Sequence, residues 1–379
     1  MRISLIGPTY PFRGGIAHYN TLLERGLRQR YGTVQFISFR RQYPAWLFPG
    51  ETDRDSSQEP IRPEQVEYLL DPLMPPTWMR VARQIERYEP DLIILQWWVP
   101  FWAAPFRTIT ALARQRTEAK VIFICHNVLP HESSRLDHLW IRLGMGKGQG
   151  FITHSPNQKE QLLTVFPQTP ICCTPHPTYA TFDTGRWQRE TARRELGFEA
   201  EDNLLLFFGF VRPYKGLRYL LEAMLMVLER IPVHLLVVGE FWKDKSEVEA
   251  QIARLGLADR VTLVDRYVPN EEVALFFRAA DLVVLPYESA TGSGVLQIAL
   301  GLECPAVVTD VGGLREIVAH DETGLIVPPK NSEALAQAIV RYFGDELGPA
   351  FIENIHRDQM RFSWDTLLDA IENLGATIC

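Results

Sequence analysis

The sequence contains few cysteines and no long apolar run. Only five of its 379 residues are cysteine, and none form a CxxC pair. This is typical of buried, reduced thiols and argues against a disulfide framework or a cysteine metal site. No apolar run approaches the roughly 20 residues that a helix needs to cross a bilayer, and the first residues lack the architecture of a signal peptide. We therefore expect a cytoplasmic protein.

The chain also lacks an excess of positive charge. Its 39 Lys and Arg residues against 46 Asp and Glu residues give a net charge of −7 and a pI of about 5.8. This balance argues against a nucleic-acid partner held by counterion release. Hydrophobic residues make up 46% of the sequence and charged residues 22%, as in globular proteins that form a core, and the length suits two or three domains.

Short apolar runs alternate with longer amphipathic segments, and the runs fall into two series. The first series covers residues 3–6, 34–38, 92–95, 121–124, 151–153 and 171–173. The second covers residues 204–208, 234–238, 261–264, 282–285 and 306–309. Continuous apolar strands separated by helical segments are typical of parallel sheets covered by helices on both faces. The sequence therefore predicts an α/β protein with two doubly wound, Rossmann-like domains.

The two series are separated by a proline-rich stretch at 174–179 and a polar stretch at 183–203. We place the N-terminal domain at residues 1–178 and the C-terminal domain at residues 185–360. Residues 39–80 interrupt the alternation and predict a long irregular excursion. The final segment predicts an amphipathic helix, because apolar residues recur at helical spacing. These residues are Trp364, Leu367, Leu368 and Ile371.

Glycine turns follow several of the predicted strands. None matches GxGxxG or GxxxxGK[ST], so a dinucleotide oxidoreductase and a P-loop phosphotransferase are both poorly supported. After the strand at 282–285, Gly292, Ser293 and Gly294 precede a helical segment that begins at Val295. Unpartnered backbone N–H groups and the helix dipole favour an anion at such a start. The stretch predicts the phosphate end of a nucleotide site, and the alternative is a turn that binds nothing.

The turn GFVRPYKG at residues 209–216 is the most informative of these. Arg212 and Lys215 lie three residues apart, between a strand end and the start of a helix. Two cations there oppose the helix dipole, which is unfavourable unless an anion joins them. A planar guanidinium fork and an ammonium point charge together suit a diphosphate. Solvated loop charges are the alternative interpretation.

Polar residues also follow predicted strands in the N-terminal half. The turn after the first strand ends in Arg13, Gly14 and Gly15, and His18 lies on the first turn of the next helix. His126 stands at the carboxyl end of a later strand. A histidine in that position is suited to hydrogen bonding with a substrate hydroxyl or to proton transfer, although a lone histidine is more often structural.

Two aromatic clusters lie in the same half. One spans 43–48, beside Arg40 and Arg41, and the other contains Trp97 and Trp98 directly after a predicted strand. Because the crevice of an open α/β sheet lies at the carboxyl ends of its strands, we expect Trp97 and Trp98 to line an acceptor site. Ordinary packing is the alternative. Aromatic rings also insert into membrane surfaces, so peripheral membrane contact is expected as well.

The triplet Asp53-Arg54-Asp55 has the form of a DxD metal site. It lies in a polar loop and not at the end of a clear strand. We therefore interpret it as a solvated loop.

Several of these motifs, taken together, resemble those of a known family. Gly14-Gly15, His126-Asn127, RPYKG at 212–216 and DVGGLREIV at 310–318 occur in the order and rough spacing of the retaining glycosyltransferases of family 4. These enzymes, the glycosyl transferases of group 1, have the GT-B fold. The resemblance covers nearly the full length. It implies two Rossmann-like domains that face each other across a cleft, with the last helix, within 362–379, crossing back to the N-terminal domain.

The resemblance further implies a retaining, metal-independent transfer of a sugar from a nucleoside-diphosphate sugar to a glycan or lipid-linked acceptor. No cofactor is expected, and polysaccharide biosynthesis in the cytoplasm or at the inner face of the membrane is the implied setting. Arg212 and Lys215 would hold the diphosphate, and the backbone of residues 292–295 would meet phosphate or sugar. Retention is usually viewed as front-face attack, in which the leaving phosphate takes the acceptor proton, so no protein nucleophile is needed.

In the N-terminal domain, the resemblance implies that Gly14 and Gly15 approach the phosphate and the sugar, with Arg13 beside them. His126 would contact the transferred sugar near the reacting centre. The candidates for the acceptor site are His18, Trp97, Trp98 and Asn127.

The chain departs from the family pattern in one place. The family commonly carries two glutamates separated by seven residues, the second of which grips the nucleotide ribose. Here the aligned positions are Ser289 and Gln297, and Glu288 lies one residue before the first. An amide still bonds a hydroxyl but lacks the charge-assisted bonds of a carboxylate. Either Glu288 takes over the role, or the donor is bound differently.

Two other functions stay open. A nucleotide-sugar epimerase on the same fold would need acid/base carboxylates around the sugar and no acceptor. A non-catalytic relative that binds nucleotide-sugar or glycan would suit the missing glutamate pair. The His126-Asn127 pair and the Gly14-Gly15 turn favour transfer over both alternatives.

Overall fold

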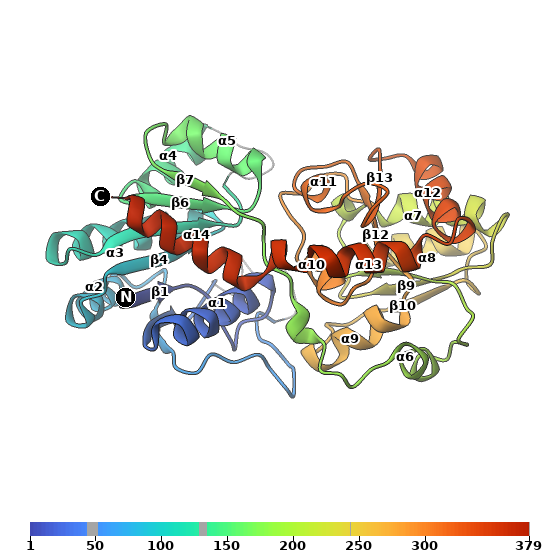
Figure 1. Cartoon of the computed structure of the whole chain (residues 1–379), viewed down its shortest axis with the longest axis horizontal. Helices are drawn as coiled ribbons and strands as arrows, with labels where there is room; N and C mark the ends of the chain where they lie inside the picture. Colours follow the sequence, from blue (N-terminus) through green and yellow to red (C-terminus); the bar gives the residue numbers. More distant parts are fainter. Residues whose placement is uncertain (44–51, 129–134, 243, 379) are drawn as a thin grey trace. The chain divides into compact units, whose positions relative to one another are not determined.

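The computed structural model describes residues 1–43, 52–128, 135–242 and 244–378. The chain divides into two compact units, each built around one sheet (Figure 1). Unit 1 consists of Met1–Ser56, Pro60–His176 and Ser363–Cys379. Unit 2 consists of Ser57–Glu59 and Pro177–Phe362. The last segment of the chain therefore belongs with the N-terminal sheet.

In the described part of unit 1, seven parallel strands form a sheet in the order β3-β2-β1-β4-β5-β6-β7. They are β1 (Ile3–Ile6), β2 (Val34–Phe39), β3 (Glu67–Leu70), β4 (Leu92–Trp97), β5 (Lys120–Cys125), β6 (Gly150–Thr153) and β7 (Ile171–Cys173). The strands β1, β4 and β6 are buried along their whole length, as a sheet covered on both faces requires. β1 pairs with β2 on one side and with β4 on the other. The strand order reverses there, so the ligand crevice of such a sheet is expected at the carboxyl ends of β1 and β4.

Helices cover both faces of this sheet. They are α1 (Gly15–Tyr31), α2 (Pro75–Tyr88), α3 (Ala103–Arg116), α4 (Arg135–Met145), α5 (Pro156–Val165) and α14 (Trp364–Thr377). On one face, Leu23 and Leu27 of α1 and Leu367 and Ile371 of α14 share one hydrophobic cluster with the strands. The helix α14 lies beside α1, although the two helices are far apart in the sequence (Figure 1). On the other face, side chains of α2, α3 and α4 pack on the sheet.

The structure corrects the expectation that residues 39–80 are irregular. The strand β3 and the beginning of α2 both lie inside this range. The alternation of apolar runs misses β3 because it is a four-residue edge strand whose Glu67 and Tyr68 are exposed. Residues 44–48, which carry most of the first aromatic cluster, lie outside the described residues.

The second aromatic cluster is part of the core. Trp97 is 0% exposed and Trp98 6% exposed, and both belong to the cluster that also contains Phe39 and Trp102. The rings of Phe39 and Trp102 stack at 4.3 Å between centroids. A ring that is enclosed by other side chains leaves no face for a sugar, so the structure corrects the expectation that Trp97 and Trp98 line an acceptor site.

In the described part of unit 2, six parallel strands form a sheet in the order β10-β9-β8-β11-β12-β13. They are β8 (Leu204–Phe208), β9 (His234–Val238), β10 (Val261–Val264), β11 (Leu282–Leu285), β12 (Ala306–Thr309) and β13 (Gly324–Val327). The first five match the predicted strands, and β13 is an addition that is only four residues long. β8 pairs with both β9 and β11, so the reversal of strand order in this sheet lies between β8 and β11.

The helices of unit 2 cover its sheet in the same way. They are α6 (Arg189–Glu195), α7 (Leu217–Leu228), α8 (Lys245–Arg254), α9 (Asn270–Ala279), α10 (Gly294–Gly301), α11 (Leu314–Ile317), α12 (Ser332–Gly344) and α13 (Gly348–Asp358). Leu220 and Met224 of α7 and Ile339 of α12 are fully buried in one cluster with the strands. Two parallel-sheet α/β units are therefore confirmed.

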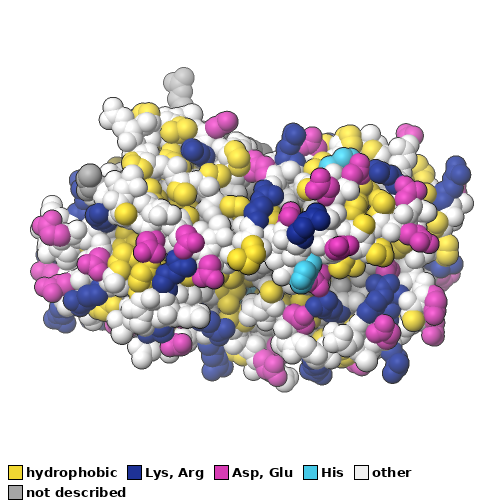
Figure 2. Space-filling model, in the orientation of Figure 1, with side chains coloured by type: hydrophobic (Ala, Val, Ile, Leu, Met, Phe, Trp, Pro, Cys, Tyr) yellow, Lys and Arg dark blue, Asp and Glu magenta, His cyan; other side chains and the backbone are white. Residues whose placement is uncertain are grey.

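The distribution of surface charge and the lengths of the helices are relevant to the expected absence of a nucleic-acid partner and to the expected membrane contact. On the face that Figure 2 displays, basic and acidic side chains are interspersed, as expected for 39 basic and 46 acidic residues in one chain. Among the described helices, none is long and apolar enough to cross a membrane.

Candidate active site

The turn after β8 is shaped by glycines at its two ends. Gly209 and Gly216 have φ angles of 91° and 69°, a region that favours glycine. A Cβ on Gly216 would lie 1.9 Å from the carbonyl oxygen of Pro286, so only glycine lets this turn approach the end of β11. The contact is continued by the backbone N–H of Glu288, which donates to the carbonyl of Tyr214 at 2.7 Å. Two loops far apart in sequence are thereby fixed side by side at the carboxyl ends of β8 and β11.

Lys215 lies in this turn and is largely buried. Only 8% of it is exposed, and its Nζ lies 3.1 Å from the place that a Cβ on Gly209 would take. Burial, and secondarily the charge of Arg212, lower the pKa of Lys215 to about 7. The ammonium form is thus destabilised by burial and by Arg212, and an anion beside Nζ would relieve that cost.

Arg212 lies next to Lys215 and is held by aromatic side chains. Its guanidinium carbon is 3.7 Å from the ring centroid of Trp242 and 5.6 Å from that of Phe210, which are cation–π distances. Burial lowers the pKa of Arg212 from its ordinary value. Among the described residues no carboxylate forms an ion pair with Arg212 or Lys215. The turn thus carries two neighbouring cations without an acidic partner among the described residues, an arrangement that suits a diphosphate.

The start of α10 closes the other side of this point. Ser293 is the N-cap, and its hydroxyl accepts a hydrogen bond from the backbone N–H of Leu296 at 3.2 Å. Val295 Cγ2 lies 3.2 Å from the position of a Cβ on Gly209. A Cβ on Gly292 would meet nothing within 4 Å, and one on Gly294 only a ring atom at 4.0 Å. The predicted anion stretch therefore lies against the predicted diphosphate turn, at the strand-order reversal of unit 2.

A small apolar cavity adjoins the same turn. It has a volume of about 90 Å³, and its wall includes Phe208, Phe210, Gly239 and Tyr267. A Cβ on Gly239 would come within 2.3 Å of the Gly209 carbonyl oxygen, so the absence of a side chain keeps the ends of β8 and β9 together here. A flat apolar group linked to a diphosphate suits such a place.

The two residues nearest the missing glutamate pair behave differently. The Glu288 carboxylate pairs with Arg218 at 2.7 Å and with Lys330 at 3.1 Å. Gln297 is 1% exposed, and neither atom of its side-chain amide has a hydrogen-bond partner among the described residues. Hydrogen-bonding capacity therefore remains at Gln297 and is already used at Glu288.

In unit 1, the glycine turn after β1 is open on its outer side. A Cβ on Gly14 or Gly15 would meet no atom within 4 Å, and Gly14 has a φ angle of 110°. Arg13 is 9% exposed, and its backbone N–H donates to the carbonyl of Asp53 at 2.9 Å. The turn thus presents bare backbone at the carboxyl end of β1, where a ligand can approach closely.

The Asp53-Arg54-Asp55 triplet packs against this turn, with Arg54 exposed and Asp53 partly exposed as in a solvated loop, and the structure corrects that interpretation for Asp55 alone. Phe12 and Arg54 form an antiparallel bridge. The Asp55 side chain is 3% exposed, and its Oδ2 lies 4.0 Å from Nε2 of His18. Burial, opposed by Asp55, lowers the pKa of His18 to about 4. His18 is therefore neutral at physiological pH and lies behind the turn.

His126 follows β5 directly, as predicted. Its backbone N–H donates to the carbonyl of Trp97 at 2.8 Å, which extends the β4–β5 pairing by one residue. Burial and the nearby His154 and His176 lower its pKa well below the ordinary value, so His126 is neutral at physiological pH. A neutral imidazole is suited to hydrogen bonding rather than to proton donation. Asn127, which follows, has a buried Oδ1 without a partner among the described residues.

The sequence analysis missed several residues of these sites. Gln96, His154 and Tyr19 surround His126, and Trp242 supports Arg212. His154 carried the same signal as His126, since it directly follows a predicted strand. Gln96 also directly follows a predicted strand, but Tyr19 and Trp242 carried no such signal, because side chains that meet from distant parts of the chain cannot be paired from spacing alone.

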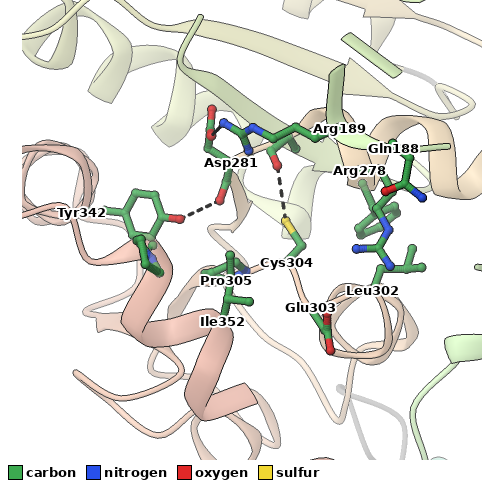
Figure 3. A pocket seen from close by; sticks show the side chains of 14 residues that line it. Gln188, Arg189, Arg278, Asp281, Leu302, Glu303, Cys304, Pro305, Tyr342 and Ile352 are labelled. Carbon is green, nitrogen blue, oxygen red and sulfur yellow. Dashed lines mark hydrogen bonds and ion pairs between the residues drawn. The ribbon is translucent and has the colours of Figure 1, made fainter. Parts of the chain in front are cut away.

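A larger cavity in unit 2 lies away from this site. It has a volume of about 410 Å³ and is lined by Asp281, Cys304 and Pro305 (Figure 3). These residues immediately precede β11 and β12, so the cavity lies at the amino ends of the strands. The candidate anion site lies at the opposite edge of the same sheet.

Comparisons with known proteins agree with both halves of this arrangement. Residues 13–178 match the model of Glycosyltransferase Family 4, and residues 202–345 match that of Glycosyl transferases group 1. Together these matches take in most of the chain. The chain belongs to the family 4, group 1 glycosyltransferases. It is a transferase, and its two parallel-sheet units are those of the GT-B fold.

Individual relatives of this glycosyltransferase are distant. An uncharacterized glycosyltransferase, MJ1607, of Methanocaldococcus jannaschii is 25% identical over 99% of this chain and 97% of that protein. A D-inositol 3-phosphate glycosyltransferase of Mycobacteroides abscessus is 31% identical over 48% of this chain and only 41% of that protein. Among solved structures, Anabaena Alr3699/HepE in complex with UDP has a TM-score of 0.75 at 18% identity, over the full length of both chains.

Proposed function

We propose that this glycosyltransferase moves a sugar from a nucleoside-diphosphate sugar to a glycan or lipid-linked acceptor, with retention of configuration and without a metal ion. One observation carries the proposal. Lys215 lies beside the start of α10 at the strand-order reversal of unit 2, Arg212 lies in the same turn, and neither has a carboxylate partner among the described residues. The UDP in the similarly folded HepE structure supports a nucleoside diphosphate as the group bound here.

The proposed role of the two cations follows from the place where negative charge develops during transfer. Cleavage of the bond between sugar and diphosphate leaves negative charge on the leaving phosphate. Lys215, Arg212 and the backbone N–H groups that begin α10 are fixed before the reaction and stabilise that charge. On this view the cations do the work for which other transferases use a divalent metal. The apolar cavity by Phe208 and Tyr267 accommodates the base.

The N-terminal unit supplies the remaining groups in the proposal. In the proposal, Gly14 and Gly15 offer open backbone to a phosphate or sugar, and neutral His126 offers a hydrogen bond to a hydroxyl of the transferred sugar. Front-face attack needs no protein nucleophile, because the leaving phosphate takes the proton of the acceptor hydroxyl.

A transfer assay with UDP-, GDP- and ADP-sugars, run with glycan and lipid-linked acceptors and with EDTA, tests this function. We expect one donor class to be used, an α-linked product from an α-linked donor by NMR, and no loss with EDTA. Alanine at Lys215 or Arg212 should lower kcat/KM about a hundredfold or more while the fold is kept. Isomerised donor without acceptor would indicate an epimerase, and binding without turnover would indicate a non-catalytic relative.

A further inference from the structure

His126 has a buried neighbour on the adjacent strand. Gln96, at the carboxyl end of β4, is 0% exposed, and its Oε1 lies 2.7 Å from Nε2 of His126. Gln96 pairs with Ile124 in the parallel register of β4 and β5. Both side chains therefore extend from backbone that is fixed by the sheet, and β4, which carries Gln96, borders the strand-order reversal of unit 1. The backbone that carries the two side chains is held by the hydrogen bonds between β4 and β5.

Behind the Gln96 amide lies a second buried amide, that of Asn20. A Cβ on Gly7 would be 2.1 Å from Nδ2 of Asn20 and 2.7 Å from Cγ of Gln96, so these two side chains converge over Gly7. Asn20 Nδ2 donates to the carbonyl of Pro8 at 2.9 Å, which leaves Oδ1 of Asn20 as a buried acceptor. Oδ1 of Asn20 and Nε2 of Gln96 are both buried without a partner among the described residues. The two atoms do not hydrogen-bond to each other, and Oε1 is the atom of the Gln96 amide that faces His126.

The proton on His126 is then assigned. Oε1 of Gln96 only accepts, so the nitrogen that faces it, Nε2, must carry the hydrogen. A neutral imidazole has a single N–H, so Nδ1 of His126 holds a lone pair.

The other titratable groups against His126 are Tyr19 of α1, His154 after β6 and His176 after β7. His154 Nδ1 lies 3.0 Å from the Thr174 carbonyl, which can only accept. Its Nε2 must therefore accept from the hydroxyl of Tyr19 at 3.1 Å. These bonds engage Tyr19 and His154 with each other, and the rings of both lie against the ring of His126. Gln96 is the side chain whose hydrogen bond defines the tautomer.

We propose that Gln96 is a positioning residue that fixes His126 with the proton on Nε2, and so presents Nδ1 as a hydrogen-bond acceptor to a hydroxyl of the transferred sugar. The proposal rests on the proposed function, because it takes His126 to contact the sugar. It makes the site selective for a donor sugar with a hydroxyl group facing Nδ1 of His126. A deoxy sugar that lacks this hydroxyl has no hydrogen to donate to the Nδ1 lone pair.

The tautomer is measured directly by long-range ¹H–¹⁵N correlation of the histidine rings in the full chain, without substrate. The His126 signal is assigned as the one lost in His126→Gln. The wild type should show a neutral ring with the proton on Nε2 from about pH 6 to 8. Gln96→Leu should give a mixture of tautomers, and Gln96→Glu should raise the pKa of His126 into the measured range because a carboxylate stabilises the imidazolium.

Kinetics supply the second readout. Gln96→Leu should lower kcat about tenfold with a smaller change in the donor KM, and Gln96→Glu should add an acidic limb to the pH profile. Gln251→Leu is the matched control, because Gln251 is also buried and donates to the Arg218 carbonyl in unit 2, far in sequence from His126.

A wild-type spectrum with the proton on Nδ1 would overturn the proposal, as would unchanged ring signals and kcat in Gln96→Leu. If Gln96→Leu does not fold, the proposal is still tested by the tautomer in the wild-type spectrum and by the His126 pKa in Gln96→Glu. Failure of the proposed function can be told apart from failure of this proposal. A protein that transfers no sugar would still show the His126 proton on Nε2.

Discussion

Oε1 of Glu288 accepts a hydrogen bond from Nη2 of Arg218 at 2.7 Å. The second oxygen of the same carboxylate lies 3.1 Å from Nζ of Lys330. Glu288 is thereby tied to the chain's own cations. Gln297, by contrast, has an amide that is buried and without a partner among the described residues.

We therefore predict that Gln297, not Glu288, bonds the donor. Gln297→Leu should raise the donor KM about fivefold to tenfold, the value of one neutral hydrogen bond, and should not lower Tm, because it removes an amide that is unsatisfied in the free enzyme. Glu288→Gln should change KM less than about threefold. Initial rates and thermal unfolding of both variants are the measurements. A larger KM effect at Glu288 would reverse the assignment.

The lowered pKa of Lys215 predicts that nucleotide binding depends on pH. A diphosphate beside Nζ favours the ammonium form, so binding takes up a proton wherever free Lys215 is neutral, that is above its pKa of about 7. UDP affinity should fall by up to about tenfold per pH unit above pH 7 and level off below it. Calorimetry at about pH 8 in two buffers of different ionisation enthalpy measures the proton uptake directly.

The control for this prediction is Lys215→Arg, which stays charged throughout the range and should bind UDP with no proton uptake at pH 8. Proton uptake that persisted in this variant would assign the effect to another group. The free energy of unfolding should also depend on pH, in the direction opposite to UDP affinity. Between about pH 7 and the ordinary pKa near 10.5, the unfolded chain holds more protons at this lysine, so the free enzyme should gain stability as pH rises through that window.

The buried guanidinium of Arg193 predicts a stability effect far from the site. Arg193 is 1% exposed and bonds Asp281 at 2.7 Å, and Arg189 contacts the other oxygen of the same carboxylate (Figure 3). Asp281→Asn should cost about 3 to 5 kcal/mol, because it leaves a buried cation without its counter-charge. Asp321→Asn is the control, since Asp321 pairs with Arg341 at the exposed surface and should cost less than about 1 kcal/mol.

Thermal and denaturant unfolding of the full chain measure both costs. Because Asp281 precedes β11 and the anion site follows it, UDP affinity of folded Asp281→Asn should be unchanged. Equal stability of the two variants would contradict the buried-pair interpretation.

Gly216 and Gly256 form a matched pair of glycines. Their φ angles are 69° and 66°, so alanine is strained equally at both. At Gly256 a Cβ would meet nothing within 4 Å, whereas at Gly216 it would lie 1.9 Å from the Pro286 carbonyl oxygen. Gly256→Ala should cost about 1 kcal/mol. Gly216→Ala should cost at least about 3 kcal/mol and should weaken UDP binding, because the turn that carries Lys215 must move.

Unfolding free energies and UDP titrations of the two alanine variants check this prediction. Equal costs at both positions would mean that the φ angle alone, and not the approach to Pro286, requires the glycine at 216.

The strand–turn–helix unit that carries Arg212 and Lys215 was predictable because its signal is local. A strand, a glycine-flanked loop with Arg212 and Lys215, and a helix are consecutive in the chain, and the physics of a helix start applies whatever surrounds it. The aromatic residues were not predictable in this way. Trp97 and Trp98 follow a strand as site residues do, and only the packing of α3 and β2 over them places them in the core.

By itself, the sequence determined two series of buried parallel strands and the cations at the end of one of them, since hydrophobic period and turn chemistry act over a few residues. Only the tertiary structure decided which distant groups meet. Three contacts depend on strand register or loop packing across 30 or more residues. They are the hydrogen bond between Gln96 and His126, the contact of buried Asp55 with His18, and the ion pair of Glu288 with Arg218. A hydrogen bond is satisfied by whichever partner the fold brings within about 3 Å, and that distance is a property of the packed chain.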